Sequence, residues 1–108
     1  MFPDNKIRNK DDIRHLFTSR SVSVKGAKLF YREHSRDISR VLVTPGKKYG
    51  NAVERNYIKR VARSIVRDIF PQLRTGYDIA LVFYSGTYTY MERYNQILML
   101  FQKTPILF

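Results

Sequence analysis

The chain has 108 residues, no cysteine, and 20 lysines and arginines against 9 acidic residues, which gives a formal net charge of +11 at pH 7. Its length predicts one domain over residues 1–108, and the lack of cysteine excludes disulfides, thiolate zinc sites and cysteine nucleophiles. No apolar run approaches the roughly 20 residues of a membrane span, so we expect a cytoplasmic protein without a membrane partner. The charge predicts a polyanionic ligand.

The first predicted element is a short helix that follows a flexible basic lead at residues 1–8. Asn9 or Asp11 can cap this helix, and adjacent aspartates suit the positive end of its dipole. Ile13 and Phe17 lie one turn apart on its apolar stripe. We therefore expect this helix to pack its stripe against the rest of the fold.

Three short segments rich in Val, Leu, Phe and Tyr come next. They predict antiparallel strands at residues 21–24, 28–34 and 39–44. In the second segment, side-chain alternation places Lys28, Phe30 and Arg32 on one face. A phenylalanine between two cations can bind single-stranded nucleic acid, although an exposed strand face with one stray aromatic residue explains the same pattern.

Residues 47–70 are the most informative stretch, because charge and helical periodicity coincide there. The spacing of apolar residues predicts a buried helical stripe made of Ile58, Val61, Ala62, Ile65, Val66 and Ile69. The positions nearly opposite that stripe hold Asn56, Arg60, Arg63 and Arg67. Arg55 and Lys59 flank this face, and Asp68 near its end is its one acid. Such a face favours an external anion, RNA or DNA, over a merely solvated surface.

A basic loop containing Lys47, Lys48 and Asn51 leads into this helix. Free backbone N–H groups at the helix N-terminus are expected to add a place for phosphates. The preceding Pro45 and Gly46 are a strong turn signal, and we expect them to end the pairing of the third strand early.

The C-terminal third of the chain reads as a strand and a helix. Pro71 ends the basic helix, and the nearly continuous apolar run at residues 79–84 predicts a central strand that is covered on both faces. Thr89 and Glu92 have the spacing of a capping box. They open a last helix whose stripe predicts core packing by Tyr94, Ile97, Leu98 and Phe101.

One motif resembles that of a known family. It reads Lys47-Lys48-x-Gly50-Asn51-Ala52-x-x-Arg55-Asn56-x-x-Lys59-Arg60. This motif is similar to the signature helix of the protein subunit of bacterial ribonuclease P, and the resemblance extends over nearly the whole chain. Tyr57 stands where the family has an arginine, and Tyr84 stands where the family's last strand commonly ends in an arginine.

The resemblance implies an α+β fold of the ribosomal-protein-like kind. It is a two-layer α/β sandwich with a mixed four-stranded sheet, elements in the order αβββαβα, and a left-handed βαβ crossover in place of the usual right-handed one. The family also implies a protein cofactor of a ribozyme, whose RNA subunit with bound Mg²⁺ removes the 5′ leader of precursor tRNA. The protein would then contribute no catalytic residue and no metal site of its own.

Two RNA-binding surfaces follow from the resemblance. Ribonuclease P RNA would dock on Lys47, Lys48, Asn51, Arg55, Asn56, Lys59, Arg60, Arg63 and Arg67. The precursor tRNA 5′ leader would lie in a cleft between the first helix and the sheet that is lined by Ile13, Phe17, Phe30 and Arg32. From the sequence alone, a purely structural place in the core explains Phe17 equally well.

Two alternatives remain open at this point. A ribosomal-type RNA-binding or assembly protein would use the same basic helix but would need no leader cleft. An autonomous metal-dependent nuclease would need several carboxylates that converge in space. The acidic residues are scattered along the sequence, and His15 and His34 stand alone, which disfavours the nuclease.

Overall fold

A computed structural model of the chain describes residues 7, 9–34 and 36–107. The predicted lead at residues 1–8 lies outside the described residues except for Ile7, which is only 4% exposed and therefore does not fit a free lead. The elements follow the predicted order αβββαβα, with a short 3-10 helix, η2 (Phe70–Gln72), inserted after the second α-helix.

The sheet contains β1 (Arg20–Val24), β2 (Ala27–Glu33), β3 (Arg40–Pro45) and β4 (Tyr77–Phe83) in the spatial order β1-β2-β4-β3. The pairs β1–β2 and β2–β4 are antiparallel, but β3 pairs with β4 in parallel. The prediction of three antiparallel strands is therefore wrong for β3. Its partner is not its neighbour in sequence but the strand that returns after a helical crossover, and local strand propensity does not reveal that choice.

Pro45 does not interrupt the sheet, contrary to the expectation from the turn signal. It is buried at the end of β3 in register with Phe83, and the next N–H, that of Gly46, donates to the Phe83 carbonyl at 2.8 Å. Because β3 is an edge strand, the nitrogen of a proline there can face the side without a neighbouring strand, so the absence of an N–H costs no hydrogen bond of the sheet. Pairing with β4 thus continues up to the start of the basic loop.

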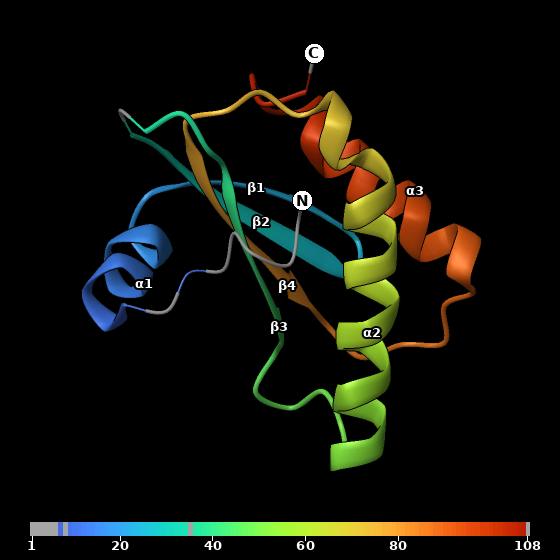
Figure 1. The fold of residues 1–108 in the computed structure, drawn as a ribbon. Coiled ribbons are helices and arrows are strands. Elements are labelled where there is room, and N and C mark those ends of the chain that lie inside the picture. The colour runs from blue at the N-terminus through green and yellow to red at the C-terminus, as the bar shows by residue number, and fades with distance from the viewer. Residues whose placement is uncertain (1–6, 8, 35, 108) are drawn as a thin grey trace.

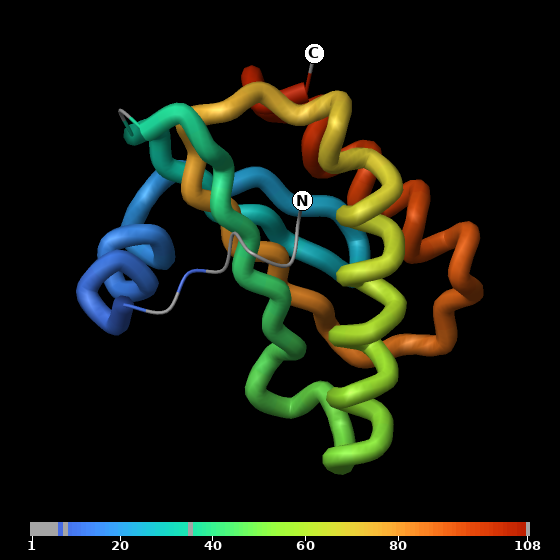
Figure 2. The backbone as a smooth tube through the Cα atoms, viewed as in Figure 1, coloured from blue at the N-terminus to red at the C-terminus, as the bar shows by residue number. Residues whose placement is uncertain are grey.

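The helices cover the two faces of the sheet unequally. Figure 1 shows α2 (Ala52–Ile69) and α3 (Tyr90–Gln102) on one face and α1 (Lys10–Phe17) on the other. The tube in Figure 2 shows α2 and α3 running side by side, and they contact each other. The sheet and the α2–α3 pair form the two main layers, while α1 covers part of the opposite surface.

The main core lies between the sheet and the α2–α3 layer. Alternate strand residues such as Leu29, Leu81 and Phe83 are fully buried there. The predicted stripe of α2 meets them, and none of its six residues is more than 8% exposed. A smaller apolar cluster lies under α1, where Leu16 and Ala80 are fully buried. Helical periodicity therefore identified the buried side of α2 correctly.

Two helix starts match their predicted caps. The Asn9 side-chain oxygen accepts a hydrogen bond from the Asp11 N–H at 2.8 Å, which caps α1. At α3 the Thr89 hydroxyl accepts from the Glu92 N–H at 3.1 Å, and the Glu92 carboxylate accepts from the Thr89 N–H at 2.8 Å. This is the capping box that the sequence predicts.

Replacement of Ile65 by alanine tests the burial of the α2 stripe. Ile65 is 0% exposed, so Ile65→Ala should lower the free energy of unfolding by about 2–5 kcal/mol through lost burial and a residual cavity. Val53→Ala on the same helix is the control, because Val53 is 77% exposed and its truncation should change that free energy by less than about 0.5 kcal/mol. Denaturant unfolding of both variants measures the difference, and equal losses would contradict this packing.

Candidate nucleic-acid interface

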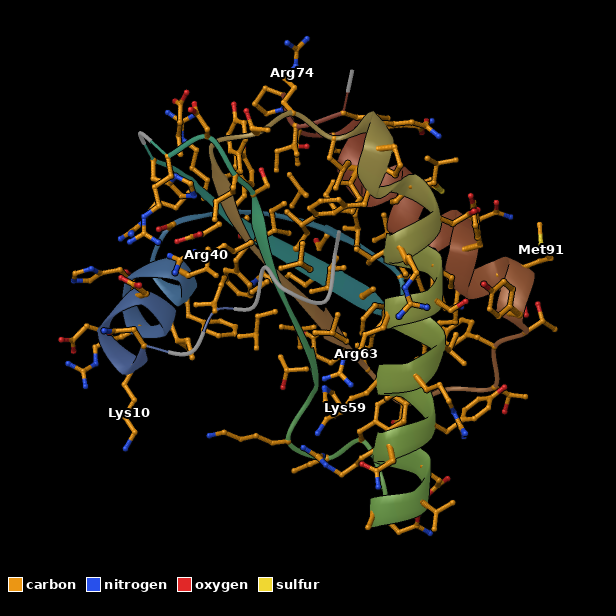
Figure 3. All side chains as sticks on the ribbon, viewed as in Figure 1. Lys10, Arg40, Lys59, Arg63, Arg74 and Met91 are labelled. Carbon is orange, nitrogen blue, oxygen red and sulfur yellow. The ribbon has the colours of Figure 1, made fainter. Side chains whose placement is uncertain are left out.

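The outward side of α2 carries the predicted cations. Asn56, Arg60 and Arg67 are exposed, whereas Lys59 and Arg63 are half-buried. Figure 3 shows Lys59 and Arg63 extending from α2 toward the side on which β3 lies. Within the described residues, no cation of α2 forms an ion pair with an acid. The helix therefore presents positive charge that the protein itself leaves unneutralised.

The two acids on α2 are engaged elsewhere. Asp68 accepts a hydrogen bond from the Tyr94 hydroxyl of α3 at 2.8 Å. Glu54 accepts from the Asn51 N–H at 3.0 Å, and the Asn51 side chain accepts from the Glu54 N–H at 2.9 Å. This capping box places a carboxylate at the helix N-terminus. The expectation of free N–H groups for phosphate at this end is therefore wrong for these two donors, and Asn51 acts as the helix cap.

The basic loop before α2 is fastened to the helix by Arg55. Its Nη1 donates to the Gly46 carbonyl at 2.8 Å, and its side chain is half-buried. Lys47 and Lys48 are exposed on that loop. Of the predicted docking residues, Arg55 thus has a structural contact of its own, while the two lysines are held out toward solvent.

The predicted leader-cleft residues come together on the α1 side of the sheet. The rings of Phe17 and Phe30 meet edge to face with centroids 4.9 Å apart, and Ile13 packs on the same cluster. Lys28 lies 4.9 Å from the centroid of the Phe30 ring. The sequence prediction placed Lys28 on this strand face but did not include it among the cleft residues. The result is a half-buried aromatic pair with a cation beside it.

Arg32, the fourth predicted cleft residue, faces acids rather than open solvent. Its Nη2 lies 3.8 Å from Asp78 and 4.0 Å from Asp12. Asp78 is fully buried and accepts two hydrogen bonds from Arg40, at 2.8 and 2.7 Å. His34 also approaches Asp78, with its Nε2 3.2 Å from a carboxylate oxygen, so it does not stand alone. Part of the positive charge expected from Arg32 is therefore neutralised.

Asp12, Arg32, His34, Arg40 and Asp78 form a charged cluster, the Asp78 cluster, which links α1 to the sheet. Arg40 bridges Asp78 of β4 and Asp12 of α1, the latter at 3.3 Å, and Figure 3 shows Arg40 beside α1. The hydrogen bond to Asp78 is the main cause that raises the pKa of Arg40 above its ordinary value. Sequence reasoning missed this cluster, because its members come from four separate elements and form no local motif.

No group of three or more histidine, aspartate or glutamate side chains in the described residues is placed to hold a metal ion. In the same residues, no helix combines the length and the apolar character that crossing a membrane requires.

Comparison with known proteins decides the family. The sequence model of the family described as Ribonuclease P matches residues 1–104. The chain belongs to the ribonuclease P protein family. It is similar to the ribonuclease P protein component of Natranaerobius thermophilus, with 35% identity over 89 residues that cover 81% of this chain and 77% of that protein.

Solved structures agree with the fold. The ribonuclease P protein from Thermotoga maritima superposes with a TM-score of 0.82 at 22% identity, over 92% of this chain and 96% of that one. The Staphylococcus aureus ribonuclease P protein gives a TM-score of 0.85 at 20% identity, over 96% and 98%. The mixed sheet and the element order implied by the resemblance are thus confirmed. Family membership makes the chain a protein component of ribonuclease P, an endonuclease of tRNA processing, and implies association with ribonuclease P RNA.

Removal of the Asp78 charge tests the link between α1 and the sheet. Asp78→Asn should lower the free energy of unfolding by about 3–5 kcal/mol, because it leaves the largely buried guanidinium of Arg40 without its main partner. Arg14→Ala breaks a pair that is 75% and 78% exposed and should cost less than about 1 kcal/mol. Thermal and denaturant unfolding measure both variants, and an Asp78 variant as stable as the Arg14 variant would rule out a structural role for this pair.

Proposed function

We propose that this ribonuclease P protein binds the catalytic RNA through α2 and its basic loop, and the 5′ leader of precursor tRNA through the α1 side of the sheet. The observation that carries this proposal is the aromatic pair of Phe17 and Phe30 with Lys28 beside it, in the cluster under α1. Figure 1 shows α1 on the face of the sheet opposite α2. A general RNA-binding helix would need no second site of this kind. Family membership also favours this function over a ribosomal-type assembly protein.

The α2 surface suits a folded RNA. Arg60 and Arg67 are exposed and have no acid partner among the described residues, and arginine can bind phosphate through two parallel hydrogen bonds. Lys47 and Lys48 extend this surface beyond the helix N-terminus. Each phosphate contact releases condensed counterions, so such a surface binds RNA strongly at low salt without reading its sequence.

The α1 side suits a single strand. Bases stack on aromatic rings with little preference for sequence, and a neighbouring lysine can neutralise a phosphate. Ile13 and Leu42 supply apolar surface around the rings of Phe17 and Phe30. A protein that holds leaders of many different tRNAs needs this kind of tolerant contact, which raises substrate affinity without supplying chemistry.

The hydrolysis itself is assigned to the RNA subunit, together with Mg²⁺ held mainly by that RNA. The state of the carboxylates that could bind Mg²⁺ near the leader site supports this assignment. The carboxylates of Asp12 and Asp78 lie 4.0 and 3.8 Å from Arg32 of the proposed leader site. They also lie 3.3 and 2.7 Å from Arg40 and pair with that cation. Mg²⁺ prefers free carboxylate or phosphate oxygens and several waters, which these paired acids do not offer.

Truncation of Phe17 tests the leader site. In the complex with ribonuclease P RNA, Phe17→Ala should weaken binding of 5′-extended precursor tRNA by about 5- to 150-fold, since stacking contributes about 1–3 kcal/mol per base, and should leave mature tRNA binding unchanged. Leu42→Ala removes a half-buried side chain from the same cluster without removing a ring, and it should preserve the preference for precursor. Equal loss for precursor and mature tRNA would refute leader binding at this site.

Salt dependence tests the α2 surface. The triple variant Arg60→Ala, Arg63→Ala, Arg67→Ala should reduce the slope of log affinity against log salt for ribonuclease P RNA by about 0.7–0.9 for each phosphate that the variant no longer neutralises. Arg36→Ala, which removes an exposed cation outside α2, should leave the slope unchanged. Filter binding over a series of salt concentrations gives both slopes. An unaltered slope in the triple variant would show that the RNA docks on another surface.

A further inference from the structure

A pocket of about 390 Å³ lies between α2, the loop at residues 85–89 and the start of α3. Apart from Tyr49, its lining residues come from α2, α3 and the loop before α3, and these two helices lie on the face of the sheet opposite α1 (Figure 1). The proposed leader site instead lies where α1 packs on the sheet. Its walls include four tyrosines, Tyr49, Tyr57, Tyr88 and Tyr90. None of these tyrosines is among the residues that were assigned above to RNA docking or to the leader cleft.

A buried arginine forms the back of this pocket. Arg93 is 3% exposed, and its guanidinium donates to the carbonyls of Gly26 and Tyr84, at 3.0 and 2.9 Å. It also donates to the Gln96 side chain at 2.9 Å and to the Tyr49 hydroxyl at 3.2 Å. All four acceptors are uncharged. The pocket therefore has behind it a positive charge that no contacting carboxylate neutralises, which favours an anionic ligand.

The side chain of Tyr88 is held in place within the pocket by Arg93 and by two glycines. Its ring centroid lies 4.4 Å from the guanidinium carbon of Arg93. Glycines make room for the ring: a Cβ at Gly26 would come within 2.8 Å of the Tyr88 hydroxyl, and one at Gly86 within 2.5 Å of the ring. Gly26 also has a positive φ of 89°, which other residues rarely adopt. The absence of a side chain at these two glycines thus leaves room for the Tyr88 ring.

At the mouth of the pocket, exposed aromatic rings lie beside the cationic face of α2. Tyr57 and Tyr90 are 56% and 44% exposed, and the Arg60 guanidinium lies 5.8 Å from the Tyr57 ring. Glu54 is the acid among the described lining residues, and its carboxylate already accepts the Asn51 N–H of the capping box. Exposed rings beside an unpaired arginine match an unpaired nucleotide, whose base stacks and whose phosphate pairs with the guanidinium.

We propose that this pocket holds one unpaired nucleotide of ribonuclease P RNA, with its base against Tyr57 and Tyr90 and its phosphate on Arg60. The identity of the RNA rests on the proposed function, which itself asks only for phosphate contacts along α2. The pocket adds a base contact at a position where the family pattern has an arginine in place of Tyr57. It makes the docking of α2 depend on an exposed base as well as on charge.

Binding of ribonuclease P RNA gives the first test. The double variant Tyr57→Ala, Tyr90→Ala should weaken binding by about 5- to 150-fold with an unchanged salt slope, because tyrosine releases no counterions. Tyr57→Phe, Tyr90→Phe keeps both rings and should bind as the original chain does. Met99→Ala removes a 49% exposed side chain of α3 that does not line the pocket, and it controls for surface truncation.

Nucleotide titration of the protein alone locates the contact. Adenosine 5′-monophosphate should shift the backbone amide resonances of residues 85–89, and ribose 5-phosphate, which lacks a base, should not. The inference is overturned if both compounds shift these resonances equally, if neither does, or if the double alanine variant binds the RNA as tightly as the original chain. Failure of the original chain to bind ribonuclease P RNA at all would instead overturn the proposed function.

Discussion

Burial of one side of α2 is the constraint on which the rest of the molecule depends. Ile58, Ile65 and Ile69 are at most 2% exposed and pack against the sheet. The side chains on the opposite side of the helix must therefore point toward solvent. The same packing makes α2 the connection between the parallel strands β3 and β4. Burial of apolar surface therefore determines the place where positive charge is presented.

Several acids of this protein stabilise its fold, and among the described residues none forms an ion pair with a cation of α2. Asp78 and Asp12 hold Arg40 and draw in Arg32 on the α1 side, while Glu54 caps α2. The buried cation of Arg93 is stabilised differently, because it donates hydrogen bonds to uncharged acceptors rather than to a carboxylate. In a chain with a net charge of +11, Asp12 and Asp78 thus lie at a junction between elements and Glu54 caps α2.

Features encoded within one or two helical turns could be predicted from the sequence, whereas features that join distant segments could not. The stripe of α2 and the Thr89 capping box follow from local spacing, and the structure has both. The direction of β3, the continued pairing at Pro45 and the contact of Arg93 with Gly26, 67 residues away, depend on long-range packing. The resemblance to the family supplied the mixed sheet that strand propensity alone would have missed. Alternation did bring Phe30 to the face where Phe17 packs, but it could not show that Arg32 would turn toward Asp78.

We propose that the protein assists an RNA that performs the cleavage. The most direct measurement is cleavage of a 5′-extended precursor tRNA at low Mg²⁺ by the protein alone, by bacterial ribonuclease P RNA alone, and by the two together. We expect efficient cleavage at the mature 5′ end only when both are present. Cleavage by the protein alone, or no effect of the protein on the RNA, would contradict it.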